Sequence, residues 1–168
     1  MSDILSKISS YNIINYMIPG GIFTYFSSYF FEGLIKTDET FLLIFFMYFI
    51  GMCISRIGSI ILEPIFTITN FVKNEDYSDY INAYEKDKKI AELLETASLY
   101  RTLSSGFAIF SIVLITKNFA DGSSILNSLS DNNILVSIFL FTLFSFSYRK
   151  QNYYISKRIK HHSAQLDF

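Results

Sequence analysis

An apolar run at residues 41–64, FLLIFFMYFIGMCISRIGSIILEP, constrains the fold more than any other part of the chain. Within residues 41–62 the run holds small hydroxyl side chains, one cysteine and a single charged residue, Arg56. A helix of this length, at about 1.5 Å per residue, is long enough to cross the roughly 30 Å hydrocarbon core of a bilayer. The run therefore predicts a membrane-spanning helix, and Pro64 discourages the helix from continuing beyond it.

Small side chains recur along one face of this expected helix, at steps that bring them close together in space. They are Gly51, Ser55, Gly58 and Ser59. A stripe of this kind lets the backbone of another helix approach closely. We therefore expect the span to pack against other helices and not only to anchor the chain.

Two charged residues lie on nearly the same face of the span, Arg56 and, seven residues later, Glu63. A charge at membrane depth costs about 2.5–3.5 kcal/mol on insertion scales unless it faces protein or water. Two interpretations carry equal weight. In the first, both residues are structural and Glu63 lies opposite Arg101. In the second, Arg56 faces a water-accessible lumen formed by several copies of the chain, with Glu63, Ser55 and Ser59 as further pore or gating candidates.

Three further segments are apolar enough to be membrane helices: residues 11–35, 102–119 and 134–148. The first contains Pro19, Gly20 and Gly21, which predict a kink or an unwound turn because proline removes a backbone donor. The alternative is an interfacial or re-entrant helix that ends at Pro19. The last segment is short for a span. With residues 41–64, these segments predict an all-α membrane protein of about four transmembrane helices.

Charged residues concentrate outside these segments, in a helical insert at residues 65–100 and a basic tail at 149–168. Apolar positions at three- and four-residue steps predict an amphipathic helix over residues 77–100. The tail mixes basic residues with tyrosines and isoleucines, as in a helix lying on an anionic leaflet. Of the 14 lysines and arginines, eleven fall on the side of the termini and the insert, and two on the other. This bias predicts that both termini and the insert are cytoplasmic.

Four basic residues near the insert, Lys86, Lys88, Lys89 and Arg101, are candidates for binding a phosphate-bearing ligand. Acidic residues alternate with them, which favours the alternative of a salt-bridged, solvated helix. The sequence contains no catalytic motif, and the adjacent histidines His161 and His162 lack the partners of a metal site. We therefore expect no enzyme activity, no metal site and no cofactor.

Three stretches of the chain resemble a known family: NYMIPGGIF at residues 15–23, RIGSIILEPI at 56–65, and YSDYINAYEKDKKIAELLETASLYRTLSS at 77–105. Over roughly residues 11–110 the chain is similar to small multi-span membrane effectors of bacterial anti-phage loci, the HalA family of the Hailong system. The fourth apolar segment and the tail add little to this resemblance.

The resemblance implies a homo-oligomeric, tetrameric ion channel in the bacterial inner membrane. It also implies that an oligonucleotide from a partner nucleotidyltransferase keeps the channel shut, and that loss of this signal during infection depolarises the membrane and stops growth. Carried onto this chain, residues 19–21 and 56–59 would be structural or pore elements. Residues 87–89 and Arg101 would face the nucleotide.

Two other classes of protein stay open. A non-conducting membrane scaffold or partner subunit would use Arg56 and Glu63 only to hold the bundle together. A holin-like or toxin-like permeabiliser would act without a ligand. The chemistry of the spans favours none of the three classes, and the resemblance favours the gated channel.

Overall fold

The computed structural model describes residues 10–30, 39–73, 75–122 and 131–163, and every regular element within them is helical. The elements are α2 (Ser10–Phe30), α3 (Thr40–Ile57), the π-helical turn η1 (Gly58–Leu62), α4 (Glu63–Ile68), α5 (Tyr77–Lys86), α6 (Lys88–Ala120) and α8 (Asn132–Ser163). The all-α class is therefore confirmed for this part of the chain. Residues 31–35 of the predicted first span and 164–168 of the tail lie outside it.

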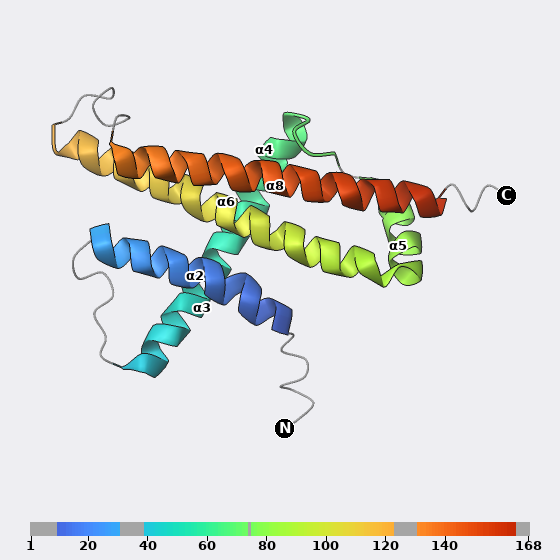
Figure 1. The fold of residues 1–168 in the computed structure, drawn as a ribbon, viewed down its shortest axis with the longest axis horizontal. Coiled ribbons are helices and arrows are strands. Elements are labelled where there is room, and N and C mark those ends of the chain that lie inside the picture. The colour runs from blue at the N-terminus through green and yellow to red at the C-terminus, as the bar shows by residue number, and fades with distance from the viewer. Residues whose placement is uncertain (1–9, 31–38, 74, 123–130, 164–168) are drawn as a thin grey trace.

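Three helices run alongside one another, and a fourth helical run crosses them. Figure 1 shows α2, α6 and α8 in the first group, with α3, η1 and α4 crossing all three. α6 and α8 form an antiparallel pair that is in contact along most of its length. In this view α2 and α6 run from right to left and α8 returns, so that α5 and the last turns of α8 lie together at the right.

The helix at residues 41–64 does not end at Pro64, contrary to the expectation from the sequence. α3, η1 and α4 form one run, Thr40–Ile68. Proline lacks a backbone N–H, and its ring collides with the carbonyl one turn earlier in a regular helix. η1 lies immediately before this position and its wider turn moves that carbonyl. Pro64 is thus accommodated in the first turn of α4.

α2 and α3 cross with their backbones in contact. A Cβ atom added to Gly20 would lie 1.7 Å from the Met47 carbonyl oxygen, and one added to Gly51 would lie 1.8 Å from the Tyr16 carbonyl oxygen. No side chain fits into such a space, so both positions require glycine. The close approach expected at Gly51 is confirmed.

α2 is helical throughout, with Pro19 in its interior. The unwound turn expected at Pro19, Gly20 and Gly21 is therefore wrong, and so is the alternative of a helix that ends at Pro19. Packing against α3 at Gly20 stabilises the helix where Pro19 removes a backbone hydrogen bond. Tertiary contact here outweighs the local effect of proline.

The amphipathic helix predicted over residues 77–100 is in fact two helices, separated at Asp87. The Asp87 backbone is extended, with φ −128° and ψ 96°, and its carboxylate accepts the Lys89 backbone N–H at 2.9 Å. Aspartate is a preferred N-cap, so this contact starts α6. The second half of the predicted insert and the segment 102–119 then belong to one helix of 33 residues.

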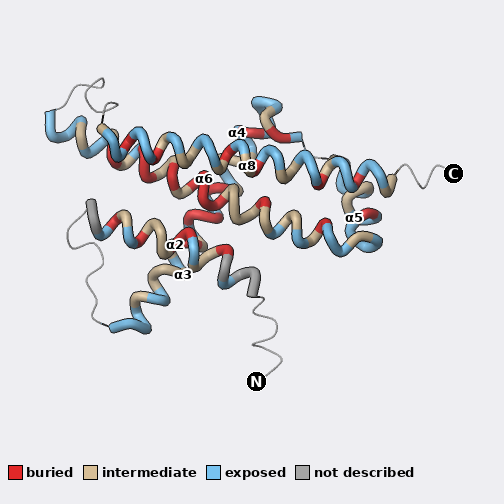
Figure 2. Tube along the Cα trace, in the orientation of Figure 1, coloured by how far each residue is buried: buried red, intermediate tan, exposed pale blue. Residues whose placement is uncertain are grey.

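Buried hydroxyl groups join α6 to α8. The Oγ atoms of Ser104 and Ser145 are 2.7 Å apart, and those of Ser111 and Ser137 are 2.8 Å apart. Figure 2 shows the buried residues gathered where the helices face one another. Ser111, Ser137 and Ser145 also lie within hydrogen-bond distance of the backbone carbonyls of Phe107 or Phe141, so these buried hydroxyls are well satisfied.

The segment 134–148 and the described part of the basic tail form a single helix, α8. Ile155 and Ile159 in the tail are 5% and 4% exposed, in a cluster that includes Val72, Ala83 and Ile90. The apolar face of the tail therefore packs on α5, α6 and the segment after α4. These two isoleucines are therefore buried inside the chain, whereas Tyr153 and Tyr154 are 63% and 44% exposed, and contact of the tail with a membrane leaflet stays a prediction.

Among the described residues, two helical segments are long and apolar enough to cross a membrane, Thr40–Ile68 and Lys88–Ala120. Of the most apolar part of the first segment, 22% is buried inside the chain, against 50% for the second. Phe41 and Ile60 are 82% and 72% exposed. Apolar surface of this extent marks contact with lipid or with another protein chain.

Candidate functional site

Arg56 lies one residue before the end of α3, and its side chain is exposed on the surface of the chain. No carboxylate among the described residues forms an ion pair with it. Ser55 beside it is buried, and Ser59 one turn later is half-buried. A guanidinium on the outside of a membrane-length helix is costly against hydrocarbon, so it requires water or a protein partner there.

Glu63 pairs with Arg101 of α6 and not with Arg56. The Arg101 guanidinium donates to the Glu63 carboxylate, and a second nitrogen lies 3.5 Å from the Ser98 hydroxyl. The side chains of Arg101 and Glu63 are 17% and 31% exposed. The pair therefore ties the start of α4 to α6, and the expected position of Arg101 opposite Glu63 is confirmed.

This pairing separates Arg101 from the other candidates for a phosphate ligand. Its guanidinium is occupied by a carboxylate, and its Nε is buried with no hydrogen-bond partner in the described part of the chain. Lys89 lies twelve residues earlier on the same helix, about 18 Å away along its axis. The structure thus does not bring Arg101 together with Lys86, Lys88 and Lys89.

The π-turn η1 lies between Arg56 and Glu63, and sequence reasoning missed it. Its first residue, Gly58, packs on α6, where an added Cβ would lie 3.2 Å from the Ser105 Cβ. Turns of this kind interrupt the regular hydrogen bonding of a helix and are frequent at functional sites. The available signal for η1 was Pro64, because the sequence stays apolar beyond this proline.

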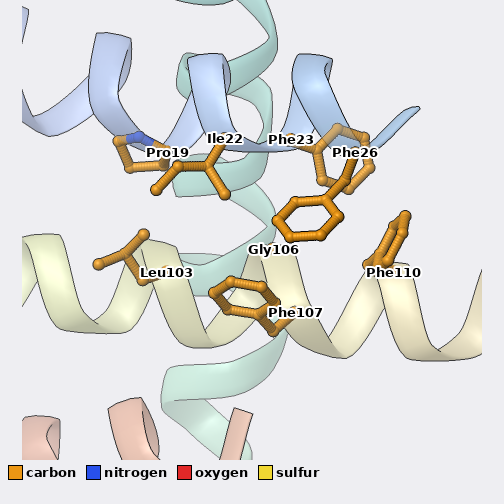
Figure 3. Close-up of a pocket in the computed structure, with 8 residues that line it drawn as sticks. All are labelled: Pro19, Ile22, Phe23, Phe26, Leu103, Gly106, Phe107 and Phe110. Carbon is orange, nitrogen blue, oxygen red and sulfur yellow. The ribbon is translucent and has the colours of Figure 1, made fainter. Parts of the chain in front are cut away.

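Aromatic rings close the interior between α2 and α6. The cavity there has a volume of about 10 Å³, close to the minimum for a single water molecule. Figure 3 shows Phe23 and Phe26 of α2 meeting Phe107 and Phe110 of α6, and the ring centroids of Phe26 and Phe110 are 5.3 Å apart. Among the described residues, this cavity leaves room for about one water molecule at most.

The start of α6 and the last turns of α8 form a groove of about 550 Å³, here called the α6–α8 groove. Its basic and aromatic lining includes Lys89, Tyr154, Lys157, Arg158, His161 and His162. Lys86 and Lys88 are exposed and lie outside this lining. Only one of the predicted lysines is therefore part of the groove. The α8 residues were missed because only long-range packing brings them to α6.

Asp87 is the acidic residue of the α6–α8 groove. It pairs with Arg158, and the Nε2 atom of His162 lies 3.5 Å from its carboxylate. Burial raises the pKa of the Asp87 carboxyl, but hydrogen bonds from Arg158 and the Lys89 backbone, with the charge of Arg158, outweigh this effect, so the pKa lies below its ordinary value. The carboxylate stays charged at neutral pH and offsets part of the positive charge of the groove.

His161 and His162 lie at this groove with their rings 5.5 Å apart. Among the residues that the structure describes, no group of three or more His, Cys, Asp or Glu side chains could hold a metal ion. His162 is instead a neighbour of Asp87.

No protein-family model matches this sequence, and neither does any curated protein or solved structure. What the chain does is therefore inferred from its own residues.

Proposed function

We propose that this chain is a homo-oligomeric, ion-conducting membrane effector of a bacterial anti-phage defence system. In this proposal the four spans are α2, the run Thr40–Ile68, and the apolar parts of α6 and α8. A nucleotide signal from a partner nucleotidyltransferase holds the channel closed. Loss of the signal opens it, depolarises the inner membrane and arrests growth.

The observation that carries the proposal is the position of Arg56. Its side chain is exposed on the less buried of the two membrane-length helices, with no carboxylate partner among the described residues. Several copies of the chain around an axis would give this guanidinium both water and protein neighbours, at the wall of a shared lumen. The closed interface between α2 and α6 supports a lumen between chains over one within a chain.

The distribution of charge supports a cytoplasmic location for the termini. α5, the start of α6 and the last turns of α8 lie at one end of the molecule, and they contain six of the chain's 14 lysines and arginines. The positive-inside rule assigns such an end to the cytoplasm. The α6–α8 groove at this end is where a soluble anionic signal would reach the protein.

The α6–α8 groove supports the nucleotide part of the proposal. Lys157 lines it without an ion pair to any described carboxylate, and Asp87 is occupied by Arg158. Lys89 also lines the groove and pairs with Glu92, an exposed residue outside the lining. Tyr154, which is 44% exposed, adds an aromatic surface of the kind on which bases stack. The family resemblance at residues 77–105 points to the same end of the chain.

We expect Arg56→Gln to alter ion conduction. Cells that express the native chain should depolarise, as measured with a voltage-sensitive dye, and the variant should change the rate of depolarisation by about tenfold, the factor given by a barrier change of about 1.4 kcal/mol. Lys150→Gln is the matched control, because it removes the same charge from an exposed position at the end of the apolar part of α8. Its rate should equal the native one.

An unchanged potential in cells with the native chain, the variant and the control, with each protein present in the membrane fraction, would remove the channel proposal. The Glu63–Arg101 ion pair then favours the second candidate, a non-conducting scaffold whose charged residues hold the bundle together. That outcome should coincide with the recovery of a stable complex with another protein. Depolarisation in every cell, insensitive to a nucleotidyltransferase, would indicate a permeabiliser without a ligand.

We expect the lining of the α6–α8 groove to carry the nucleotide response. Co-expression of a nucleotidyltransferase encoded beside this chain should suppress depolarisation by the native chain but not by Lys89→Gln/Lys157→Gln, because that variant loses two lining charges. Lys86→Gln/Lys88→Gln removes two nearby charges outside the lining and should respond as the native chain does. If instead Lys86→Gln/Lys88→Gln escaped suppression and Lys89→Gln/Lys157→Gln did not, the ligand would bind on the outer face of α5 and α6. An equal response in both variants would contradict nucleotide binding by these lysines.

A further inference from the structure

A second groove, of about 500 Å³, lies between α8 and the segment that follows α4. We call it the α4–α8 groove. Its lining includes Phe71, Lys73, Arg149, Asn152, Tyr153 and Lys157. Lys157 borders both this groove and the α6–α8 groove. The proposed channel function uses none of the other residues.

The α4–α8 groove has an excess of positive charge that the described part of the chain does not neutralise. Lys160 pairs with Glu75 at 3.1 Å, and both residues line the groove. Lys73, Arg149 and Lys157 form no ion pair with any described carboxylate. Three cations around a hollow of this size favour an anionic occupant, because its charge would offset their mutual repulsion.

One end of the groove joins an apolar surface. The Arg149 guanidinium lies over the Phe71 ring, with its Cζ 5.0 Å from the ring centroid. Phe71 also meets Phe146 of α8 edge to face, with centroids 5.5 Å apart, and Phe146 is 55% exposed. Phe71 therefore separates a cationic surface from an apolar one that continues along the apolar part of α8.

The groove also lies where a membrane-length helix ends. The run Thr40–Ile68 ends three residues before Phe71, and its last residue is 79% exposed. Arg149 directly follows the apolar part of α8. Both helices that border the groove thus change from apolar to charged residues close to it, as at the boundary between membrane and water.

We propose that the α4–α8 groove binds the phosphate of an anionic phospholipid headgroup. Arg149 and Lys73 hold the phosphate, and an acyl chain lies along Phe146. Arginine suits this role because its planar guanidinium can donate two parallel hydrogen bonds to a phosphate. Basic pockets at the cytoplasmic ends of membrane helices bind such headgroups. Lipid binding is measured without ion current, so this inference holds whether or not the chain conducts.

The test is native mass spectrometry of the full chain in mild detergent, titrated with phosphatidylglycerol or with phosphatidylcholine of the same acyl chains. The native chain should retain phosphatidylglycerol preferentially. Arg149→Gln/Lys73→Gln should reduce this retention by about twenty-five-fold, at roughly one factor of five per basic residue. Lys150→Gln/Lys86→Gln has the same net charge, alters no lining residue and should bind like the native chain.

A soluble phosphate compound shares this chemistry, so inorganic pyrophosphate is titrated in a parallel experiment. The native chain could bind pyrophosphate, lose this binding only in Arg149→Gln/Lys73→Gln, and retain no lipid. That outcome would show that the groove is a phosphate site whose ligand is a soluble phosphate compound and not a lipid. Equal lipid retention by the two double variants, or equal retention of the two lipids by the native chain, would overturn the proposal. Arg149→Lys keeps the charge but loses the two parallel hydrogen bonds, so it should retain phosphatidylglycerol better than Arg149→Gln/Lys73→Gln and less well than the native chain. Circular dichroism confirms that each variant is folded.

Discussion

Gly20→Ala should destabilise the fold by about 1–3 kcal/mol, the usual effect of forcing extra volume into a tightly packed contact. The new methyl group would lie 1.7 Å from the Met47 carbonyl oxygen and 2.9 Å from the Gly51 backbone nitrogen. Both are backbone atoms that cannot rotate away, so α2 and α3 must separate. Titration with dodecyl sulfate, followed by circular dichroism of the purified chain in mild detergent, measures this loss as a lower midpoint.

Gly21→Ala is the matched control for this substitution. At Gly21 the added Cβ would lie 3.7 Å from the Met47 sulfur, an ordinary contact with a flexible side chain. Alanine favours a helix interior over glycine by about 1 kcal/mol, so this variant should be as stable as the native chain or more stable. Equal midpoints for the two variants would contradict the backbone contact between α2 and α3.

Glu63→Gln should destabilise the fold by about 2–3 kcal/mol. The substitution leaves the Arg101 guanidinium partly buried without its carboxylate, and breaking a fully buried pair in this way costs about 3–5 kcal/mol. The lower figure takes account of the 31% exposure of the Glu63 side chain. The same unfolding titration measures the effect.

The exposed pair of Lys89 and Glu92 provides the comparison. Its side chains are 55% and 65% exposed, so Glu92→Gln should cost less than about 0.5 kcal/mol. Replacing both members of the inner pair, as in Glu63→Leu/Arg101→Met, should restore most of the lost stability, because no unpaired charge is left behind. A Glu63→Gln variant as stable as the native chain would show that the pair contributes nothing to the fold.

The features that the sequence predicted correctly are those encoded in a short window. The apolar runs at residues 41–62 and 102–119 identified the two membrane-length helices, because length and apolarity alone define such a segment. The spacing of small residues identified Gly51 as a close helix contact. Glu63 and Arg101 are 38 positions apart, and their pairing was predicted as one of two alternatives.

The features that sequence reasoning missed depend on contacts between distant segments. Pro64 is tolerated inside a helix only because η1 precedes it. Pro19 is tolerated because α3 packs against Gly20, the residue that follows this proline. The break at Asp87 was missed because the apolar periodicity of residues 77–100 continues across it. The two basic grooves combine side chains from α8 with segments far earlier in the chain, and no local pattern contains that information.

The continuity of α6 and α8 has a mechanical consequence. Both prolines of the chain lie elsewhere, and helices bend sharply mainly at proline and at irregular turns. α6 has 33 residues, so it is about 50 Å long and exceeds the thickness of a hydrocarbon core by about 20 Å. Two pairs of serines hold α6 against α8, so we expect α6 to move as a rigid unit. A displacement of its end near Asp87 would then tilt the whole helix and move its opposite end.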